Sequence, residues 1–194
     1  MNDLEGTLAP FARFLDSERI PYMVIGGFAN LKWGRPRLTQ DLDVTVQVAD
    51  EEVPAFLRRL PDVYKVLVPR PEEFVHDTRA LPLRAPTGTR IDLIFAGLPF
   101  EDKAISRAVE LDIEGYRVRV CTAEDLVVHK LASERARDRE DVQGILLRQG
   151  KALDRSYLDP LVEQVASSLD RPEILQFYRD TLKFAESVRD PSNG

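Results

Sequence analysis

An alternating run of eight residues, Asp41 to Val48, constrains the fold of this chain more than any other stretch. Its even positions are apolar and its odd positions are polar, which is the period of a half-buried β-strand. Asp41 and Asp43 therefore leave the same face, with Cβ atoms about 7 Å apart. Two carboxylates held so close repel each other unless a cation lies between them. A divalent ion such as Mg²⁺ suits them, because it takes oxygen ligands from carboxylates and substrate phosphates.

A glycine pair precedes this strand. Gly26 and Gly27 follow the short apolar run Tyr22–Ile25 and lie upstream of Asp41. Glycines directly after a strand let the backbone turn tightly and approach a ligand closely. A helix is predicted over Phe28–Trp33, and its free N–H groups would point at an anion. A nucleoside triphosphate (NTP) with its metal fits this combination of turn, helix and carboxylates.

The glycine pair followed by Gly34, Arg37, Thr39, Asp41 and Asp43 resembles the signature of the nucleotidyltransferase superfamily, whose fold is shared by DNA polymerase beta and aminoglycoside nucleotidyltransferases. Within it, the chain is most similar to the AbiEii-like branch of nucleotidyltransferase toxins from abortive-infection systems. Phe28 follows the glycines where many members have Ser or Thr, so the resemblance implies phosphate contacts through the backbone. The implied fold class is α/β (α+β), a small mixed sheet flanked by helices and followed by a C-terminal helical region.

A third acidic residue, Asp92, lies in the second strand of a hairpin predicted over Leu81–Ala85 and Arg90–Phe95. The apolar residues that alternate with Asp92 share the opposite face of this strand. A carboxylate in an apolar strand is costly to bury unpaired, so it reaches either solvent or a cation. The resemblance implies a cation, because the superfamily has a third acidic residue on a neighbouring strand.

Two helices after Thr122, a predicted N-cap, carry charges on their apolar faces. Lys130 falls on the apolar stripe of the first helix, and Asp138 and Asp141 project to the inner face of the second. Buried charges should be paired. Two interpretations stay open: a structural bridge between Lys130 and one of these aspartates, or a lysine that reaches the triphosphate while the aspartates orient it. The segment from Lys130 to Asp141 resembles the run that closes the core in the AbiEii-like branch.

The remaining helices and strands are predicted from the spacing of the apolar residues and from the glycine, proline and capping residues between them. We expect strands at Tyr64–Val68 and within Asp112–Val120, a loop or brief helix at Pro69–Asp77, and helices at the following ranges: Leu4–Ser17, Ala49–Leu60 with Asp50 as its cap, Pro99–Val109, Ala123 to about Arg135, about Asp138–Arg148, Ser156–Leu169 and Pro172–Val188. The predicted domains are a nucleotidyltransferase core over residues 1–121 and a C-terminal helical region over 122–194, packed on the core.

Composition narrows the class of protein. The 194 residues are 43% hydrophobic and 31% charged, as in ordinary globular domains. The single cysteine, Cys121, excludes an internal disulfide and a cysteine-based zinc site, and it fits a cytoplasmic location. We expect no signal peptide and no membrane segment. The formal net charge of −6 weakens non-specific nucleic-acid binding, although basic residues cluster near Arg37 and after Lys130.

The hypothesis from sequence is Mg²⁺-dependent transfer of a nucleoside monophosphate from an NTP to an acceptor hydroxyl. Asp41, Asp43 and Asp92 would bind two metal ions and act in catalysis, and Gly26, Gly27, Arg37, Thr39 and Lys130 would bind the nucleotide, supported by Asp138 and Asp141. By resemblance the acceptor is an RNA (tRNA) end and the partner an antitoxin protein. The alternatives are a small, aminoglycoside-like acceptor, which the acidic chain suits, and a non-catalytic nucleotide-binding regulator.

Overall fold

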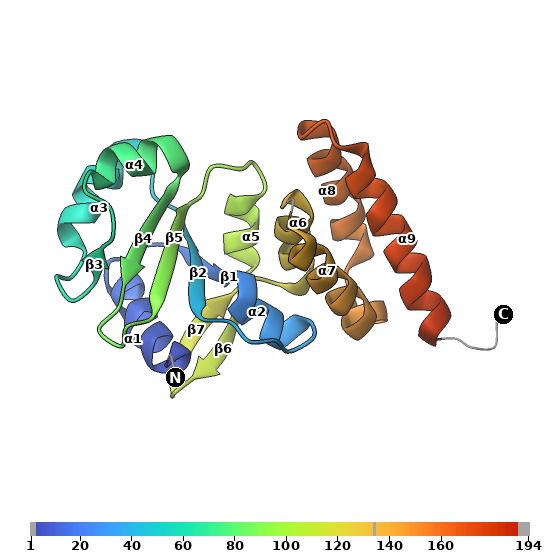
Figure 1. Ribbon diagram of the computed structural model, residues 1–194, viewed down its shortest axis with the longest axis horizontal. Helices are drawn as coiled ribbons and strands as arrows, with labels where there is room; N and C mark the ends of the chain where they lie inside the picture. The colour runs from blue at the N-terminus through green and yellow to red at the C-terminus, as the bar shows by residue number, and fades with distance from the viewer. Residues whose placement is uncertain (1–2, 134, 190–194) are drawn as a thin grey trace. The chain divides into compact units, whose positions relative to one another are not determined.

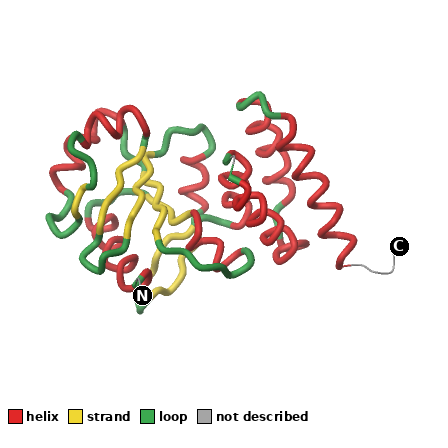
Figure 2. Tube along the Cα trace, viewed as in Figure 1, coloured by secondary structure: helices red, strands yellow, loops and turns green. Residues whose placement is uncertain are grey.

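The computed structural model describes residues 3–133 and 135–189. Figures 1 and 2 show its strands and helices along the chain. The strands are β1 (Tyr22–Ile25), β2 (Asp41–Val46), β3 (Lys65–Val66), β4 (Ala80–Arg84), β5 (Arg90–Phe95), β6 (Val109–Ile113) and β7 (Tyr116–Val120). The helices are α1 (Leu4–Ser17), α2 (Gly26–Trp33), α3 (Val53–Arg59), α4 (Pro71–Thr78), α5 (Glu101–Arg107), α6 (Ala123–Ala132), α7 (Ala136–Gln149), α8 (Arg155–Ser168) and α9 (Pro172–Arg189). Two short 3₁₀ helices lie at Asp50–Glu52 and Gly150–Ala152.

All the strands of the described chain join one mixed sheet in the order β3-β4-β5-β2-β1-β7-β6. The β2 strand lies at its centre, antiparallel to β1 and parallel to β5. The predicted hairpin is confirmed as β4 and β5, and a second hairpin forms from β6 and β7. This mixed sheet with flanking helices confirms the fold class expected from the sequence.

The alternation along β5 fixes the two faces of the sheet. Ile91, Leu93 and Phe95 are almost fully buried, whereas the residues between them are only partly buried. The ring of Phe95 packs edge-on against Phe56 of α3, which in turn lies against Phe14 of α1. The apolar face of β5 therefore packs beside α1 and α3, and the polar side chains of the same strand leave the other face.

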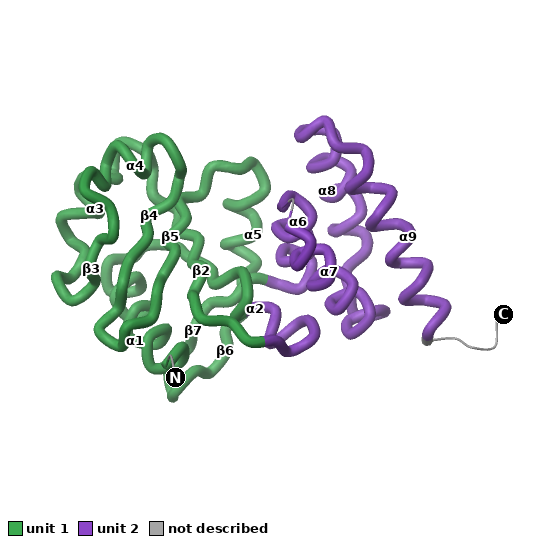
Figure 3. The backbone as a smooth tube through the Cα atoms, in the orientation of Figure 1, with its two compact units in different colours: residues 1–28, 38–121 green, residues 29–37, 122–194 purple. Residues whose placement is uncertain are grey.

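The chain divides into two compact units, shown in different colours in Figure 3. The first contains residues 1–28 and 38–121, and the second contains residues 29–37 and 122–194. The boundary lies inside α2, whose first three residues belong to the first unit and whose remainder belongs to the second. The second unit therefore combines two stretches of chain that are far apart in the sequence.

The second unit is helical, and polar contacts join its helices. The Thr122 hydroxyl accepts a hydrogen bond from the backbone N–H of Asp125, which confirms the predicted N-cap of α6. The Tyr157 hydroxyl of α8 donates to the carboxylate of Asp125, and the Tyr178 hydroxyl of α9 donates to Asp159 of α8. These bonds tie α6, α8 and α9 together. No described helix combines the length and the apolar character needed to cross a membrane.

Several predicted boundaries were wrong in an informative way. Asp50 does not cap α3: it lies in a 3₁₀ turn, and its carboxylate instead pairs with Arg79, whose backbone is left-handed. The strand expected over Tyr64–Val68 shrinks to two exposed residues at the sheet edge. Val109, expected to end a helix, begins β6 instead. The contact with Arg79 accounts for Asp50, and pairing with Val120 of β7 accounts for Val109.

Candidate active site

Two neighbouring parallel strands bring the predicted carboxylates together. In the register of β2 and β5, Asp43 lies opposite Asp92, and Asp41 lies opposite Arg90. Side chains directly opposite each other in a sheet leave the same face, and residues two apart on one strand do so as well. Asp41, Asp43, Arg90 and Asp92 thus form a two-by-two array, which we call the acidic array. It holds three carboxylates and one guanidinium.

Within the acidic array, Arg90 pairs with Asp92. Its Nε donates to Oδ1 and Oδ2 of Asp92 at 2.9 and 3.1 Å, and a terminal guanidinium nitrogen lies 2.7 Å from Oδ1. The hydrogen bond to Asp92 raises the pKa of Arg90 above its ordinary value, and the charges of Asp41 and Asp43 act in the same direction. The Arg90 guanidinium therefore interacts electrostatically with all three carboxylates.

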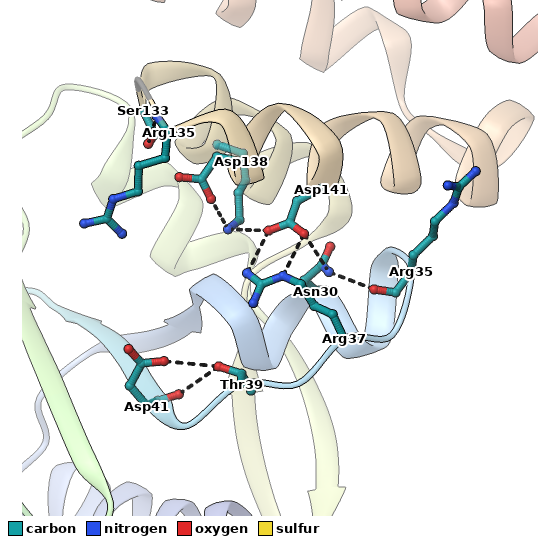
Figure 4. A network of polar contacts seen from close by, with 10 residues as sticks. Asn30, Arg35, Arg37, Thr39, Asp41, Ser133, Arg135, Asp138 and Asp141 are labelled. Atoms are coloured by element: carbon teal, nitrogen blue, oxygen red, sulfur yellow. Dashed lines mark hydrogen bonds and ion pairs between the residues drawn. The ribbon is translucent and has the colours of Figure 1, made fainter.

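The carboxylate of Asp41 has its own local partner. The Thr39 hydroxyl donates to Oδ1 of Asp41 at 3.1 Å and lies 3.4 Å from the Asp41 carbonyl oxygen (Figure 4). This bond fixes the side chain of Asp41 at the first residue of β2, where the pairing with β5 begins. Thr39 and Asp41, both selected from the sequence, are thus in direct contact.

The glycine turn lies against the same residues. Gly26 has a positive φ of 65°, and a Cβ added there would collide with the carboxylate of Asp43. A Cβ at Gly27 would collide with the hydroxyl of Thr39. Two successive glycines are required here because the side chains of Asp43 and Thr39 occupy the space beside the turn. The helix α2 begins at Gly26 itself, two residues earlier than expected.

A separate polar network lies within the second unit, centred on Asp141 of α7 (Figure 4). Arg37 donates from Nε to Oδ1 and from a terminal nitrogen to Oδ2, both at 2.9 Å. The Asn30 amide donates to Oδ1 of Asp141 at 3.1 Å and to the backbone carbonyl of Arg35 at 3.0 Å. Asp141 therefore fastens the segment that carries Arg37 to helix α7.

Lys130 of α6 completes this network. Its ammonium lies 2.5 Å from Oδ1 of Asp138 and 2.8 Å from Oδ2 of Asp141, and its side chain is only 8% exposed. Burial raises the pKa of Asp141, but the hydrogen bonds from Arg37 and Lys130 outweigh it, so that this pKa lies below its ordinary value. The contacts of Lys130 are those of the structural bridge that the sequence left open.

The residues selected from the sequence thus fall into two groups. The first unit brings together Gly26, Gly27, Thr39, Asp41, Asp43 and Asp92. The second brings together Arg37, Lys130, Asp138 and Asp141. Sequence reasoning missed two participants. Arg90 could have been found, because it lies two residues before Asp92 on the same strand face, whereas no local signal marks Asn30 as a partner of Asp141.

The acidic array fits Mg²⁺ by the chemistry of its donors. Three carboxylates on adjacent strands offer the hard oxygen ligands that this ion prefers. As they stand, no three His, Cys, Asp or Glu side chains over residues 3–133 and 135–189 lie together as a metal site. Both oxygens of Asp92 accept hydrogen bonds from the Arg90 guanidinium.

Solved structures with a similar fold are nucleotidyltransferases or resemble them. The antibiotic-resistance factor ANT(2'')-Ia has a TM-score of 0.57 at 16% identity, covering 89% of this chain and 97% of its own. An antigenic nucleotidyltransferase-like protein from Paracoccidioides brasiliensis has a TM-score of 0.54 at 20% identity, covering 91% and 92%. The lincosamide antibiotic adenylyltransferase LnuA, solved with lincomycin, has a TM-score of 0.51 at 15% identity, covering 75% and 98%. At these identities the likeness shows a common fold.

The comparison of sequences adds the family. A search of curated proteins found no significant match. A family model described as a nucleotidyltransferase of unknown function (DUF6036) matches residues 11–189, which is nearly the whole chain. Together with the shared fold, this match means that the chain belongs to the DUF6036 family of nucleotidyltransferases.

Proposed function

We propose that this protein transfers a nucleoside monophosphate from an NTP to an acceptor hydroxyl in a Mg²⁺-dependent reaction. The observation that carries the proposal is the register of β2 and β5, which sets Asp43 beside Asp92 on the sheet face that also carries Asp41. The glycine turn at Gly26 lies directly against Asp43. Carboxylates beside a turn with closely approachable backbone are what a metal-bound triphosphate needs.

The reaction balances as an in-line displacement at phosphorus. The acceptor oxygen bonds to the α-phosphorus, the bond from that phosphorus to the oxygen bridging to the β-phosphate breaks, and pyrophosphate leaves. Asp92 is the candidate to accept the proton of the acceptor hydroxyl. Two Mg²⁺ ions held by Asp41, Asp43 and Asp92 would neutralise charge on the attacking and leaving oxygens.

The nucleotide would be held by residues around the turn and by cations. Backbone N–H groups at Gly26 and Gly27 would contact phosphates, and the Thr39 hydroxyl would stabilise charge on the polyphosphate. Arg37 donates two hydrogen bonds to Asp141, so its contact with the polyphosphate stays a prediction. Lys130 is already engaged with both Asp138 and Asp141, so its contacts favour a structural role.

We also propose that the chain consists of a nucleotidyltransferase core over residues 1–121 and a C-terminal helical region over residues 122–194. We further propose that the protein is cytoplasmic.

For the acceptor, we propose an RNA end, with the protein acting as an AbiEii-like toxin opposed by an antitoxin protein. The supporting observation is a set of exposed cations on the second unit, which comprises Lys32, Arg35, Arg135, Arg137 and Arg139. Exposed Lys and Arg side chains neutralise phosphates and thereby supply most of the affinity for RNA backbones.

A small cationic acceptor is the second candidate, and the charge of the chain favours it. The formal net charge of −6 creates a field that attracts polycations. Two proteins of similar fold are named for antibiotics: ANT(2'')-Ia as an antibiotic-resistance factor, and LnuA as a lincosamide adenylyltransferase. The two acceptor classes differ in their response to salt, since RNA binding weakens steeply as the salt concentration rises.

The test is incubation of the purified protein with each of the four labelled NTPs, Mg²⁺ and either total tRNA or an aminoglycoside mixture. Asp43→Asn is the inactive variant. Asp77→Asn is the matched control, because Asp77 is an exposed carboxylate of the first unit on α4. We expect label on tRNA with the wild type and Asp77→Asn, and none with Asp43→Asn.

Stability separates a lost function from a lost fold. Removing one carboxylate of the acidic array relieves like-charge repulsion, so Asp43→Asn should keep its melting temperature within about 4 °C of the wild type. Label on the aminoglycosides alone would select the second candidate. If no acceptor is labelled and NTP binding does not depend on Mg²⁺ or Asp43, the proposed function is wrong.

A further inference from the structure

The acidic array has an imbalance of charge that the proposed function leaves unexplained. Three of its four side chains are carboxylates, and Arg90 is its one cation. Arg90 is paired with one of these carboxylates. It directs three short contacts to Asp92, the residue on which a metal ion and an acceptor proton would both depend.

The ion pair between Arg90 and Asp92 is partly exposed to solvent. The Arg90 side chain is 51% exposed and the Asp92 side chain 24% exposed. Ion pairs at such positions contribute little net stability, because water solvates the separated charges well. A divalent ion shared by several carboxylates offers more charge at the same place, so it can compete for Asp92.

Resting on the proposed function, we propose that Arg90 is a built-in counter-ion of the acidic array, and that its pairing with Asp92 and the binding of a divalent metal exclude each other. Without metal, Arg90 offsets the repulsion among Asp41, Asp43 and Asp92. When metal binds, the guanidinium releases both oxygens of Asp92 and returns to solvent. Arg90 therefore stabilises the metal-free protein and lowers its affinity for metal.

The nearest matched residue is Arg84, which lies opposite Arg90 in the antiparallel pair of β4 and β5. Directly opposite residues share a face, so Arg84 leaves the same side of the sheet as the acidic array. Its guanidinium donates to the backbone carbonyl of Gly88. Neutralising Arg84 therefore changes the charge of the same face by the same amount without removing a partner of Asp92.

The experiment measures Mn²⁺ affinity by electron paramagnetic resonance in the absence of nucleotide, together with the melting temperature with and without Mn²⁺. The proteins are the wild type, Arg90→Gln, Arg90→Lys, Arg84→Gln and Asp43→Asn. We expect Arg90→Gln to bind Mn²⁺ about threefold to tenfold more tightly than the wild type, with Arg84→Gln within about twofold. Without metal, Arg90→Gln should melt at a lower temperature than Arg84→Gln, and Arg90→Lys should lie between Arg90→Gln and the wild type.

The outcomes separate the two proposals. If Asp43→Asn abolishes Mn²⁺ binding but Arg90→Gln binds no more tightly than the wild type, the metal site stands and the counter-ion role is wrong. If Arg90→Gln binds more weakly, Arg90 positions Asp92 for the metal and does not compete with it, which also overturns the inference. If no variant binds Mn²⁺ saturably, the metal site proposed for the reaction fails and the inference fails with it.

Discussion

Arg37 donates hydrogen bonds to both carboxylate oxygens of Asp141, a residue 104 positions later in the chain, at 2.9 Å each. The Asp141 side chain is 5% exposed, and it also accepts from Asn30 and Lys130. One carboxylate thus holds two cations and an amide. The segment that carries Arg37 owes its conformation to helix α7 as much as to its own sequence.

Asp141→Asn is expected to destabilise the protein strongly. The substitution keeps the shape of the side chain but leaves the Arg37 guanidinium without its opposite charge, and breaking a buried ion pair costs about 3–5 kcal/mol. Urea unfolding measures the loss. Asp180→Asn is the control, since Asp180 is an exposed carboxylate of α9 that accepts from Gln176, and it should change stability by less than about 1 kcal/mol. Equal effects of the two substitutions would contradict a central role for Asp141.

Lys130→Met tests the structural bridge. It leaves the carboxylates of Asp138 and Asp141 buried without their shared ammonium, so we expect a loss of about 3–5 kcal/mol in the free energy of unfolding. Asp141 keeps its ion pair with Arg37, so the charge that the substitution exposes most is that of Asp138, and adding Asp138→Asn should recover part of the loss. The measurement is urea unfolding of both variants.

Nucleotide affinity distinguishes the alternative for Lys130. Under conditions where Lys130→Met is still fully folded, a structural bridge predicts a Kd for ATP within about threefold of the wild type. If Lys130 contacts the triphosphate, its replacement by Met should instead lower the affinity for ATP at least about tenfold, which corresponds to ~1.4 kcal/mol. Calorimetric titration of Mg²⁺-ATP into both proteins decides between the two.

Gly26→Ala should be far more harmful than the same change at Gly88. Both glycines have positive φ, 65° and 85°, so alanine is strained at each by about 1–2 kcal/mol. A Cβ at Gly88 meets nothing within 4 Å, whereas one at Gly26 collides with the Asp43 carboxylate. Overpacking of this kind costs about 1–3 kcal/mol more.

The collision at Gly26 has a direct control. In an Asp43→Ala background the colliding carboxylate is gone and only the Cβ at position 43 remains, 2.9 Å from the added Cβ, so most of the extra penalty of Gly26→Ala over Gly88→Ala should disappear. Thermal unfolding of the wild type, Gly26→Ala, Gly88→Ala, Asp43→Ala and the double variant at positions 26 and 43 gives the comparison. A penalty for Gly26→Ala that is the same with and without Asp43 would show that backbone strain alone is responsible.

Stability should fall on the acid side because two carboxyl groups have depressed pKa values. Burial raises the pKa of Asp141 and of Asp159, but hydrogen bonds from Arg37 and Lys130, and from Arg155 and Tyr178, outweigh it. As the pH falls through the ordinary carboxyl value of 3.8, the unfolded chain takes up protons before the folded one, so the folded state loses stability. The contribution is complete above about pH 5 and disappears as the pH falls through the folded pKa values.

The measurement is the urea midpoint between pH 7 and pH 3. The wild type should lose stability below about pH 5, and Asp141→Asn should start from a lower value and decline less steeply over this range. Parallel curves for the two proteins would mean that the ionisation of Asp141 is not linked to folding.

The sequence predicts the central part of the fold because its local signals agree with the tertiary structure. The alternation in β5 correctly assigns the buried face, that in β2 does so except at Thr45, which is fully buried, and Thr122 caps α6 as expected. Prediction fails where a distant partner decides. Aspartate is a common helix N-cap residue, but the carboxylate of Asp50 pairs with Arg79, 29 residues later in the chain.

The candidate site was predictable in its chemistry and less so in its pairings. Asp41, Asp43 and Asp92 follow from strand period and resemblance, and β2 and β5 set Asp43 and Asp92 in register. Arg90 was missed although its pairing with Asp92 is local, two residues along the same strand. Asn30 could not be found in this way, because its partner Asp141 lies 111 residues later in the chain. The roles of the selected residues stay predictions.

The boundary inside helix α2 limits how such a chain can be rearranged. Residues 29–37 lie within the first half of the sequence, yet Asn30 and Arg37 find their partner in Asp141. A chimera that replaces everything after residue 121 with the helices of a relative would keep this segment while discarding the carboxylate that holds it. Exchange of the helical unit therefore needs two crossovers, and the nine-residue segment has to travel with the helices.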